Sequence, residues 1–494
     1  MRQWLPKRHP NRSSWEERTN QDENHPDLLL TKNDQKMTTL SQKMLSNWSR
    51  LGTRFLPFAD AATPDVPLTR LLRLSLFQVS VGMALVMLIG TLNRVLIVEL
   101  KVPAFLVSIM ISIPLIFAPF RAVIGFRSDT HRSALGWKRV PYIWMGTLVQ
   151  FGGFAMMPFG LLVLSGAGQA SHAPQWIGQV GAGIAFLLVG AGLHTTQTVG
   201  LALANDLVPP ESQPKVVGLM YVMLLIGMIL SAVSFGHLLS DFSPGRLIQV
   251  VQGAALLTIV LNVVALWKQE VRKPAHLYPE QAKGKTFNEA WTEFRKGNDA
   301  TRRLIAVGIG TMAFSMEDIL LEPFGGDVLK LTVSQTTSLT AALAAGGLIG
   351  FGWASYILSK GADPFRMSRF GALLGIPAFL AVISSGFLGE PLIFAFGTSL
   401  IGFAAGIFGH GTLTATMNLA PENQSGLALG AWGAVQASAA GVAIALGGMI
   451  RDLVASRTNS SLIGYSTVYS VEIGLLVMTM IAMSPLIKAS KKGK

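Results

Sequence analysis

Long apolar stretches separated by polar loops dominate the chain from residue 72 to residue 487. Most of the stretches have about 20 residues or more, the length that an α-helix needs to cross the hydrocarbon core of a bilayer. The pattern predicts an all-α polytopic membrane protein with twelve transmembrane helices. We place them at residues 72–100, 104–126, 140–165, 176–203, 216–239, 247–267, 304–324, 336–358, 365–388, 391–419, 426–450 and 464–487.

A short segment that occurs twice divides the predicted spans into two sets. LHTTQTVGLALA begins at Leu193 and GHGTLTATMNLA begins at Gly409, so His194 and His410 are 216 residues apart, close to half of the chain. Six spans, a polar linker and six more spans with such a repeat indicate two pseudo-symmetric halves, as in the major facilitator superfamily fold. We expect six-helix bundles at residues 71–267 and 304–487.

The polar segments outside the spans predict three cytoplasmic parts: an N-terminal extension at residues 1–70, a linker at 268–303 with an amphipathic helix, and a basic tail at 488–494. Alternate loops and the tail carry about twenty Lys and Arg side chains against about five in the other loops, which is the positive-inside pattern. Both termini are then cytoplasmic. The net charge of +13 therefore reports orientation and contact with anionic membrane lipids, not nucleic-acid binding.

Composition agrees with a membrane protein and limits its chemistry. Half of the residues are hydrophobic, 14% are charged, and the mean hydropathy is +0.46. The absence of cysteine excludes disulfides, thiolate metal sites and cysteine catalysis. The sequence has no phosphate-binding loop, dinucleotide fingerprint, nucleophile elbow or zinc-ligand cluster, so we expect no enzymatic activity.

The loop after the second span, GFRSDTHRSALGWKRVPYIWMG from Gly125, has glycine, acidic and basic positions similar to the facilitator signature between spans two and three. Asp129 can accept hydrogen bonds from arginine side chains or helix-end N–H groups and so connect neighbouring helices. We predict a cytoplasmic conformational latch here, in preference to plain positive-inside charge. Its residues are Gly125, Asp129, Arg132, Gly136, Lys138 and Arg139.

Four segments carry a more specific resemblance. GTLNRVLIVEL from Gly90, RSDTHRSALGWKRVPYIW from Arg127, MEDILLEPFGGDVL from Met316 and the HTTQT segment resemble the PucC/LhaA family of facilitator-fold proteins. The resemblance extends from about residue 68 to the C-terminus. It implies a non-catalytic protein of the bacterial cytoplasmic or intracytoplasmic membrane that delivers or inserts (bacterio)chlorophyll. The partners it implies are light-harvesting antenna polypeptides, pigment-synthesis enzymes and the reaction-centre complex. It supplies no agreed pigment site.

The twin histidines are the first binding candidates, because equivalent helices carry them in the cytoplasmic third of the membrane. His194 shares a helix face with Thr198, and His410 shares one with Thr414. A neutral imidazole could bind the magnesium of a chlorophyll, with its other nitrogen fixed by an acceptor. We favour an interhelical hydrogen bond, which contributes about 0.6–2 kcal/mol; proton handling is a third interpretation.

Carboxylates in the seventh span form a second candidate site. Glu317, Asp318 and Glu322 lie in the outer third of the membrane, where they need water, a proton or an ionic partner. Glu317 lies 223 residues after Arg94 of the first span, as Glu322 does after Glu99. An Arg94–Glu317 pair would join the halves as an outer gate. The alternative is that all of these side chains reach interfacial water.

Glu472 lies about 12 Å into the twelfth span, which is peripheral in the facilitator fold. It either faces a partner helix or a bound pigment on the outer wall, or turns inward and bonds a neighbouring span. Glu472 completes the pigment-ligand candidates with the two histidines, and no metal is expected beyond chlorophyll magnesium. Arg121, at the end of the second span, is expected to extend to the interface.

Three functions remain open from the sequence. The favoured one is an assembly factor that binds (bacterio)chlorophyll and presents it to antenna polypeptides. The second is an alternating-access transporter of a pigment or another amphiphile. The third is a pigment-free scaffold for antenna subunits.

Overall fold

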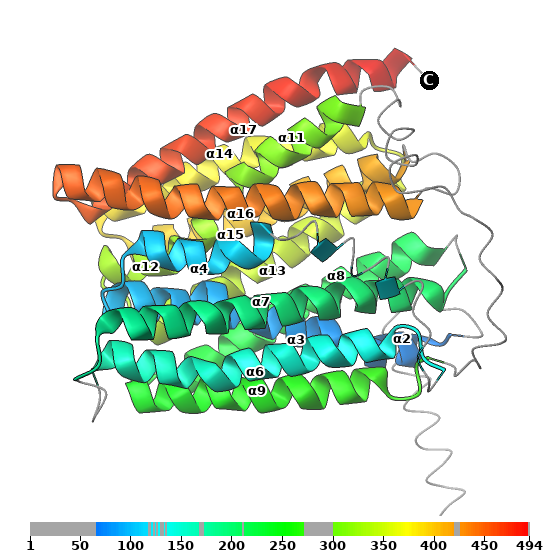
Figure 1. Cartoon of the computed structure of the whole chain (residues 1–494). Coiled ribbons are helices and arrows are strands. Elements are labelled where there is room, and N and C mark those ends of the chain that lie inside the picture. The colour runs from blue at the N-terminus through cyan, green and yellow to red at the C-terminus, as the bar shows by residue number, and fades with distance from the viewer. Residues whose placement is uncertain are drawn as a thin grey trace, which may run out of the picture. The chain divides into compact units, whose positions relative to one another are not determined.

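The computed structural model describes residues 66–492, except 117–119, 122–123, 125–126, 129–132, 134–135, 167–171, 210–211, 271–299 and 419–424. All elements in these residues are helices (Figure 1), as the hydrophobic pattern predicts. Eleven of them are long and apolar enough to cross a membrane, and a shorter apolar helix covers Ala104–Leu115. The N-terminal extension and the amphipathic part of the linker lie outside the described residues.

The first six predicted spans form the N-terminal half. Its helices are α2 (Leu68–Leu74), α3 (Leu76–Leu85), η2 (Val86–Leu92), η3 (Val95–Glu99), α4 (Ala104–Ile116), α6 (Val140–Ser165), α7 (Gln175–Asp206), α8 (Gln213–Leu238) and α9 (Pro244–Leu266).

The C-terminal half contains the remaining six spans. Its helices are α11 (Ala300–Ala313), η7 (Glu317–Ile319), α12 (Leu321–Asp327), α13 (Val333–Ser359), α14 (Pro364–Leu388), α15 (Pro391–Asn418), α16 (Ser425–Thr458) and α17 (Ser461–Lys492).

Packing follows the two halves. Within the N-terminal half α6 packs against α7 and α9, and within the C-terminal half α15 packs against α13 and α14. Two main contacts join the halves: α8 packs on α13, and α4 packs on α16. These are the pairs formed by spans five and eight and by spans two and eleven. The halves therefore meet around the helices that carry the candidate site.

Spans one and seven both leave regular α-helical geometry in their second half. Span one continues from α3 into the π-helical segments η2 and η3, whereas span seven breaks after Ala313 and resumes as the 3₁₀ turn η7 and the short helix α12. The irregular segments lie in corresponding spans of the two halves, the first span of each. Such interruptions in membrane helices often mark functional sites.

Candidate functional site

A cavity of about 320 Å³ lies between the halves, beside the irregular segments of spans one and seven. Both halves line it, with α4, α7 and α8 from one side and α13, α15 and α16 from the other. Its wall is mostly apolar and its size is that of a small-molecule site. The polar side chains that converge on it are His194, Gln197, Asp318, Glu322, Thr340 and Thr398.

Glu322 is held in the cavity wall by threonines of α13. Its carboxylate accepts a hydrogen bond from Thr340 Oγ1 and a long one, 3.5 Å, from Thr337 Oγ1. Thr337 Oγ1 also lies 3.4 Å from Thr91 Oγ1 of η2. This buried network connects span seven to span eight and, through Thr91, to the opposite half of the protein.

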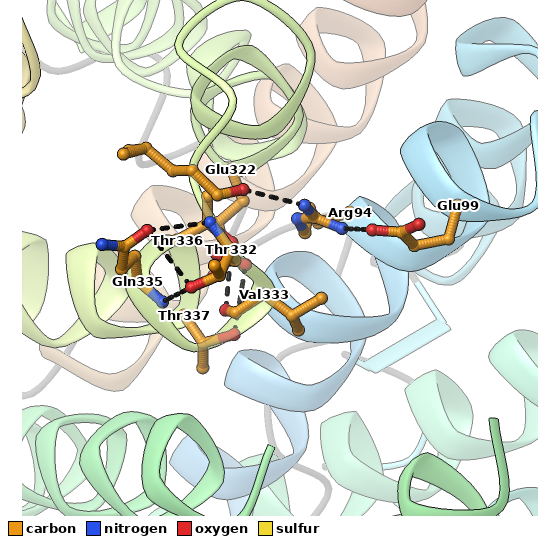
Figure 2. A network of polar contacts seen from close by, with 9 residues as sticks. Arg94, Glu99, Glu322, Thr332, Val333, Gln335, Thr336 and Thr337 are labelled. Atoms are coloured by element: carbon orange, nitrogen blue, oxygen red, sulfur yellow. Dashed lines mark hydrogen bonds and ion pairs between the residues drawn. The ribbon is translucent and has the colours of Figure 1, made fainter. Parts of the chain in front are cut away.

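Arg94 joins the halves beside the cavity. Its Nη1 lies 2.5 Å from Glu99 Oε1 (Figure 2). Its Nη2 donates across the interface to the Leu331 carbonyl at 3.0 Å. An added Cβ at Gly326 would come within 2.9 Å of Nη2, so glycine allows the guanidinium to lie on this backbone. The predicted Arg94–Glu317 pair is wrong in its partner, because Arg94 binds the carboxylate of its own span.

Two further hydrogen bonds close the same end of the interface, which we call the Glu99 end. Asn93 Nδ2 donates to the Ile319 carbonyl at 2.7 Å. The backbone N–H of Phe105, in the first turn of α4, donates to Asp452 Oδ2 of α16 at 2.8 Å. We call this part of the interface between the halves the seam. It is held by hydrogen bonds to backbone groups, which complementary charges in the sequence do not reveal.

Glu317 turns away from Arg94 and meets Glu472. Its backbone N–H donates to Glu472 Oε1 at 2.8 Å, and the two residues are 2% and 0% exposed. Of the two interpretations of Glu472, the inward one with a bond to a neighbouring span is confirmed, and the outward one as a pigment ligand on the outer wall is wrong. Asp318, the next residue, lines the cavity instead, because neighbouring helical residues point about 100° apart.

A second ionic cluster at the Glu99 end was not predicted. Arg451 of α16 binds Asp327 Oδ2 at 3.0 Å, Asp452 Oδ1 at 2.8 Å and the Tyr465 hydroxyl at 3.2 Å. It ties spans seven, eleven and twelve together. The adjacent Arg451 and Asp452 look like ordinary loop charges in the sequence, because span eleven was expected to end before them.

The twin histidines occupy equivalent helices but different surroundings. His194 of α7 lines the cavity and is 9% exposed, and its Nδ1 has no hydrogen-bond partner among the described residues. His410 of α15 packs on Phe351 of α13, with ring centroids 4.2 Å apart. Only His194 is therefore placed beside the cavity.

Arg121 folds back onto α7 near His194. Its Nε donates to Thr198 Oγ1 at 2.9 Å and its Nη2 to Gln197 Oε1 at 3.0 Å. The expectation that Arg121 extends to the interface is wrong, because polar groups of α7 offer hydrogen bonds within reach. One of them, Gln197, also lines the cavity.

The described part of the latch loop binds acids that the sequence did not single out. Arg139 Nε lies 2.9 Å from Asp206 Oδ2 at the end of α7. The Glu270 carboxylate accepts the backbone N–H groups of Lys138 at 2.6 Å and Val140 at 2.9 Å, and so caps the start of α6. Gly136 has a left-handed φ of 79°. Gly125, Asp129 and Arg132 lie outside the described residues, so their roles stay predictions.

Two six-helix halves around a central cavity define a multi-pass membrane protein of the major facilitator superfamily fold. A bacterial homologue of the human lysosomal transporter Spinster, in an inward-facing and unoccupied conformation, has this fold. Its TM-score to the chain is 0.63 at 15% identity, over 85% of this chain and 97% of that one. At this identity the likeness concerns the fold alone.

The chain belongs to the PUCC protein family, whose sequence profile matches residues 91–491. It is 60% identical over 426 residues to protein PucC of Rhodovulum sulfidophilum, which is 86% of this chain and 94% of that protein. It is also 28% identical over 396 residues to the bacteriochlorophyll synthase 44.5 kDa chain of Rhodobacter capsulatus, 78% of this chain and 88% of that protein. The family predicted from the four sequence segments is confirmed.

Proposed function

We propose that this protein is an assembly factor for a photosynthetic light-harvesting antenna complex, which holds a (bacterio)chlorophyll and delivers it to antenna polypeptides. The observation that carries the proposal is the central cavity, whose mostly apolar wall receives a few polar side chains from both halves. An apolar wall with a few polar groups suits the polar part of an amphiphile. The printed name of one relative, the bacteriochlorophyll synthase 44.5 kDa chain, supports a bacteriochlorophyll cargo.

Two buried polar side chains of the cavity wall could bind polar groups of a chlorin. The imidazole of His194 borders the cavity and its Nδ1 lacks a partner in the described part of the chain, as does the Oγ1 of Thr398. An imidazole nitrogen can bind the magnesium of a chlorin, and a hydroxyl can donate to a carbonyl at its rim. His410 packs on Phe351 and Glu472 binds Glu317, so the proposal uses only His194 as the magnesium ligand.

The same proposal places the protein in the bacterial cytoplasmic or intracytoplasmic membrane with both termini in the cytoplasm. The antenna polypeptides, pigment-synthesis enzymes and the reaction-centre complex are its partners. The protein itself catalyses no reaction; its residues bind, orient and release the pigment.

A cavity-filling variant tests the proposal in cells. Ala440 lines the cavity on α16, whereas Val442 of the same helix is 44% exposed. A phototroph that lacks the gene should regain antenna absorption with the wild type and with Val442→Phe, but not with Ala440→Phe at equal membrane abundance. Normal antenna absorption in the deletion strain, or in the Ala440→Phe strain, would contradict the proposal.

Alternating-access transport of a pigment or another amphiphile is the second candidate. It is favoured by the seam at the Glu99 end, where Arg94 and Asn93 hold two irregular spans together with few bonds. Gradient-driven uptake of chlorophyll into reconstituted vesicles, lost in Glu322→Gln, would favour transport over retention of a bound pigment.

A further inference from the structure

A second hollow, of about 450 Å³, lies between α11 and α16. Its lining is almost all hydrocarbon, and Ile305 in its wall is 52% exposed, so the groove opens at the surface of the described chain. Both helices are candidate membrane spans by length and composition, so the groove runs along the membrane-spanning part of the protein. The side chains that line it include Leu304, Ile305, Ile309, Met312, Val435 and Ala439.

The groove and the central cavity border the same two spans at nearby positions. On α16, Ala439 lines the groove and the next residue, Ala440, lines the cavity. On span seven, Met312 lines the groove, and Asp318 lines the cavity beyond the break that follows Ala313. Consecutive residues of a helix point about 100° apart, so the groove and the cavity lie on neighbouring faces of α16 at Ala439 and Ala440.

One hollow is partly polar and the other is apolar, which matches the polar and apolar ends of an amphiphile. The cavity offers an imidazole, carboxylates and hydroxyls, whereas the groove offers aliphatic side chains. We propose that the groove binds the hydrocarbon chain of the ligand whose polar part occupies the cavity. The inference rests on the proposed function: for a (bacterio)chlorophyll, this chain is the isoprenoid tail esterified to the macrocycle. From Thr301 to Met312 the groove follows α11 for about 16 Å.

Gly308 leaves space in the groove that the packing of the helices does not require. A Cβ added there would lie 3.4 Å from Val435 Cγ1, an ordinary van der Waals distance, so helix packing does not require a glycine. At Gly310 on the same helix, by contrast, the ring of Phe408 leaves no room for a Cβ. Glycine at 308 keeps space open, and a leucine there would occupy it.

Two ligands that differ only in the tail test the proposal. The full chain in mild detergent is titrated with bacteriochlorophyll and with bacteriochlorophyllide, which lacks the tail. Burial of several methylene groups should give the wild type at least about tenfold tighter binding of the tailed form. Gly308→Leu and Ala439→Leu should lose this preference and keep the affinity for bacteriochlorophyllide. Gly253→Leu, on α9 where a Cβ meets open space, should behave as the wild type.

Equal binding of the two ligands by the wild type, or an unchanged preference in both groove variants, would overturn the proposal. If the wild type binds neither ligand, the proposed function fails, and a diazirine-bearing fatty alcohol in nanodiscs decides about the groove. Labelling concentrated on residues 300–313 and 432–445, and blocked by Gly308→Leu, supports it. Uniform labelling of all lipid-facing helices overturns it.

Discussion

Glu317 and Glu472 bring two carboxyl groups together where the protein excludes solvent. The 3₁₀ turn η7 begins at Glu317, and the first N–H groups of a helical turn have no acceptor within it. Glu472 supplies that acceptor from α17. A buried N–H without a partner costs about 1–3 kcal/mol, so Glu472 stabilises the break in span seven.

Substitution of Glu472 distinguishes a hydrogen-bond acceptor from a charge. Glu472→Gln keeps a carbonyl oxygen at the same position and should leave the thermal unfolding temperature in detergent nearly unchanged. Glu472→Leu removes the acceptor and should lower the unfolding free energy by about 1–3 kcal/mol. Equal destabilisation by the two variants would show that the Glu317 N–H bond is not what the residue contributes.

Individual site residues could be predicted from the sequence only in part. Depth in the membrane follows from counting helix residues, and this brought Arg94, Glu317 and Glu322 to the same region. The direction of each side chain did not follow, because π-helical and 3₁₀ segments change the rotation of every later residue. A pairing based on a constant register therefore joined Arg94 to Glu317, although Arg94 binds Glu99.

At the scale of single elements, the seam at the Glu99 end depends on span one contacting spans seven and eight. Arg94→Met removes the bond to the Leu331 carbonyl and should loosen this end. Because the chain has no native cysteine, spin labels can be placed at the exposed positions His237 and Glu390, one in each half. Their distance distribution should broaden toward longer distances in Arg94→Met.

The matched control for the seam is Arg366→Met, which removes an exposed arginine at the start of α14. Its distance distribution should equal that of the parent protein. An unchanged distribution in Arg94→Met would mean that the remaining seam contacts hold this end without the guanidinium.

Glu270 provides an element-scale prediction for the latch. Its carboxylate accepts N–H groups at the start of α6, and loss of such a cap costs about 0.5–2 kcal/mol. Glu270→Ala should therefore accelerate hydrogen exchange at residues 138–142, while Asp241→Ala, an exposed acid between α8 and α9, should not. Identical exchange in the two variants would exclude the cap as the source of order in this loop.

At the scale of the whole molecule, hydropathy and the repeated histidine segment were sufficient to predict the fold. Hydropathy is averaged over a whole span and the repeat is read from the order of residues, so neither depends on individual side-chain contacts. The cavity was not predictable in this way, because it results from how helices of the two halves pack and from two interrupted spans. The repeat correctly placed His194 and His410 on equivalent helices, but only His194 of the two lines the cavity.

The most direct test of the account is the pigment content of the full chain purified in mild detergent from a phototrophic host. We predict about one extractable chlorin per protein, with an absorption band that is shifted or lost in His194→Ala and unchanged in His410→Ala. A chain that purifies without chlorin yet retains antenna polypeptides would contradict pigment binding and support a scaffold. A band altered by His410→Ala but not by His194→Ala would contradict the site.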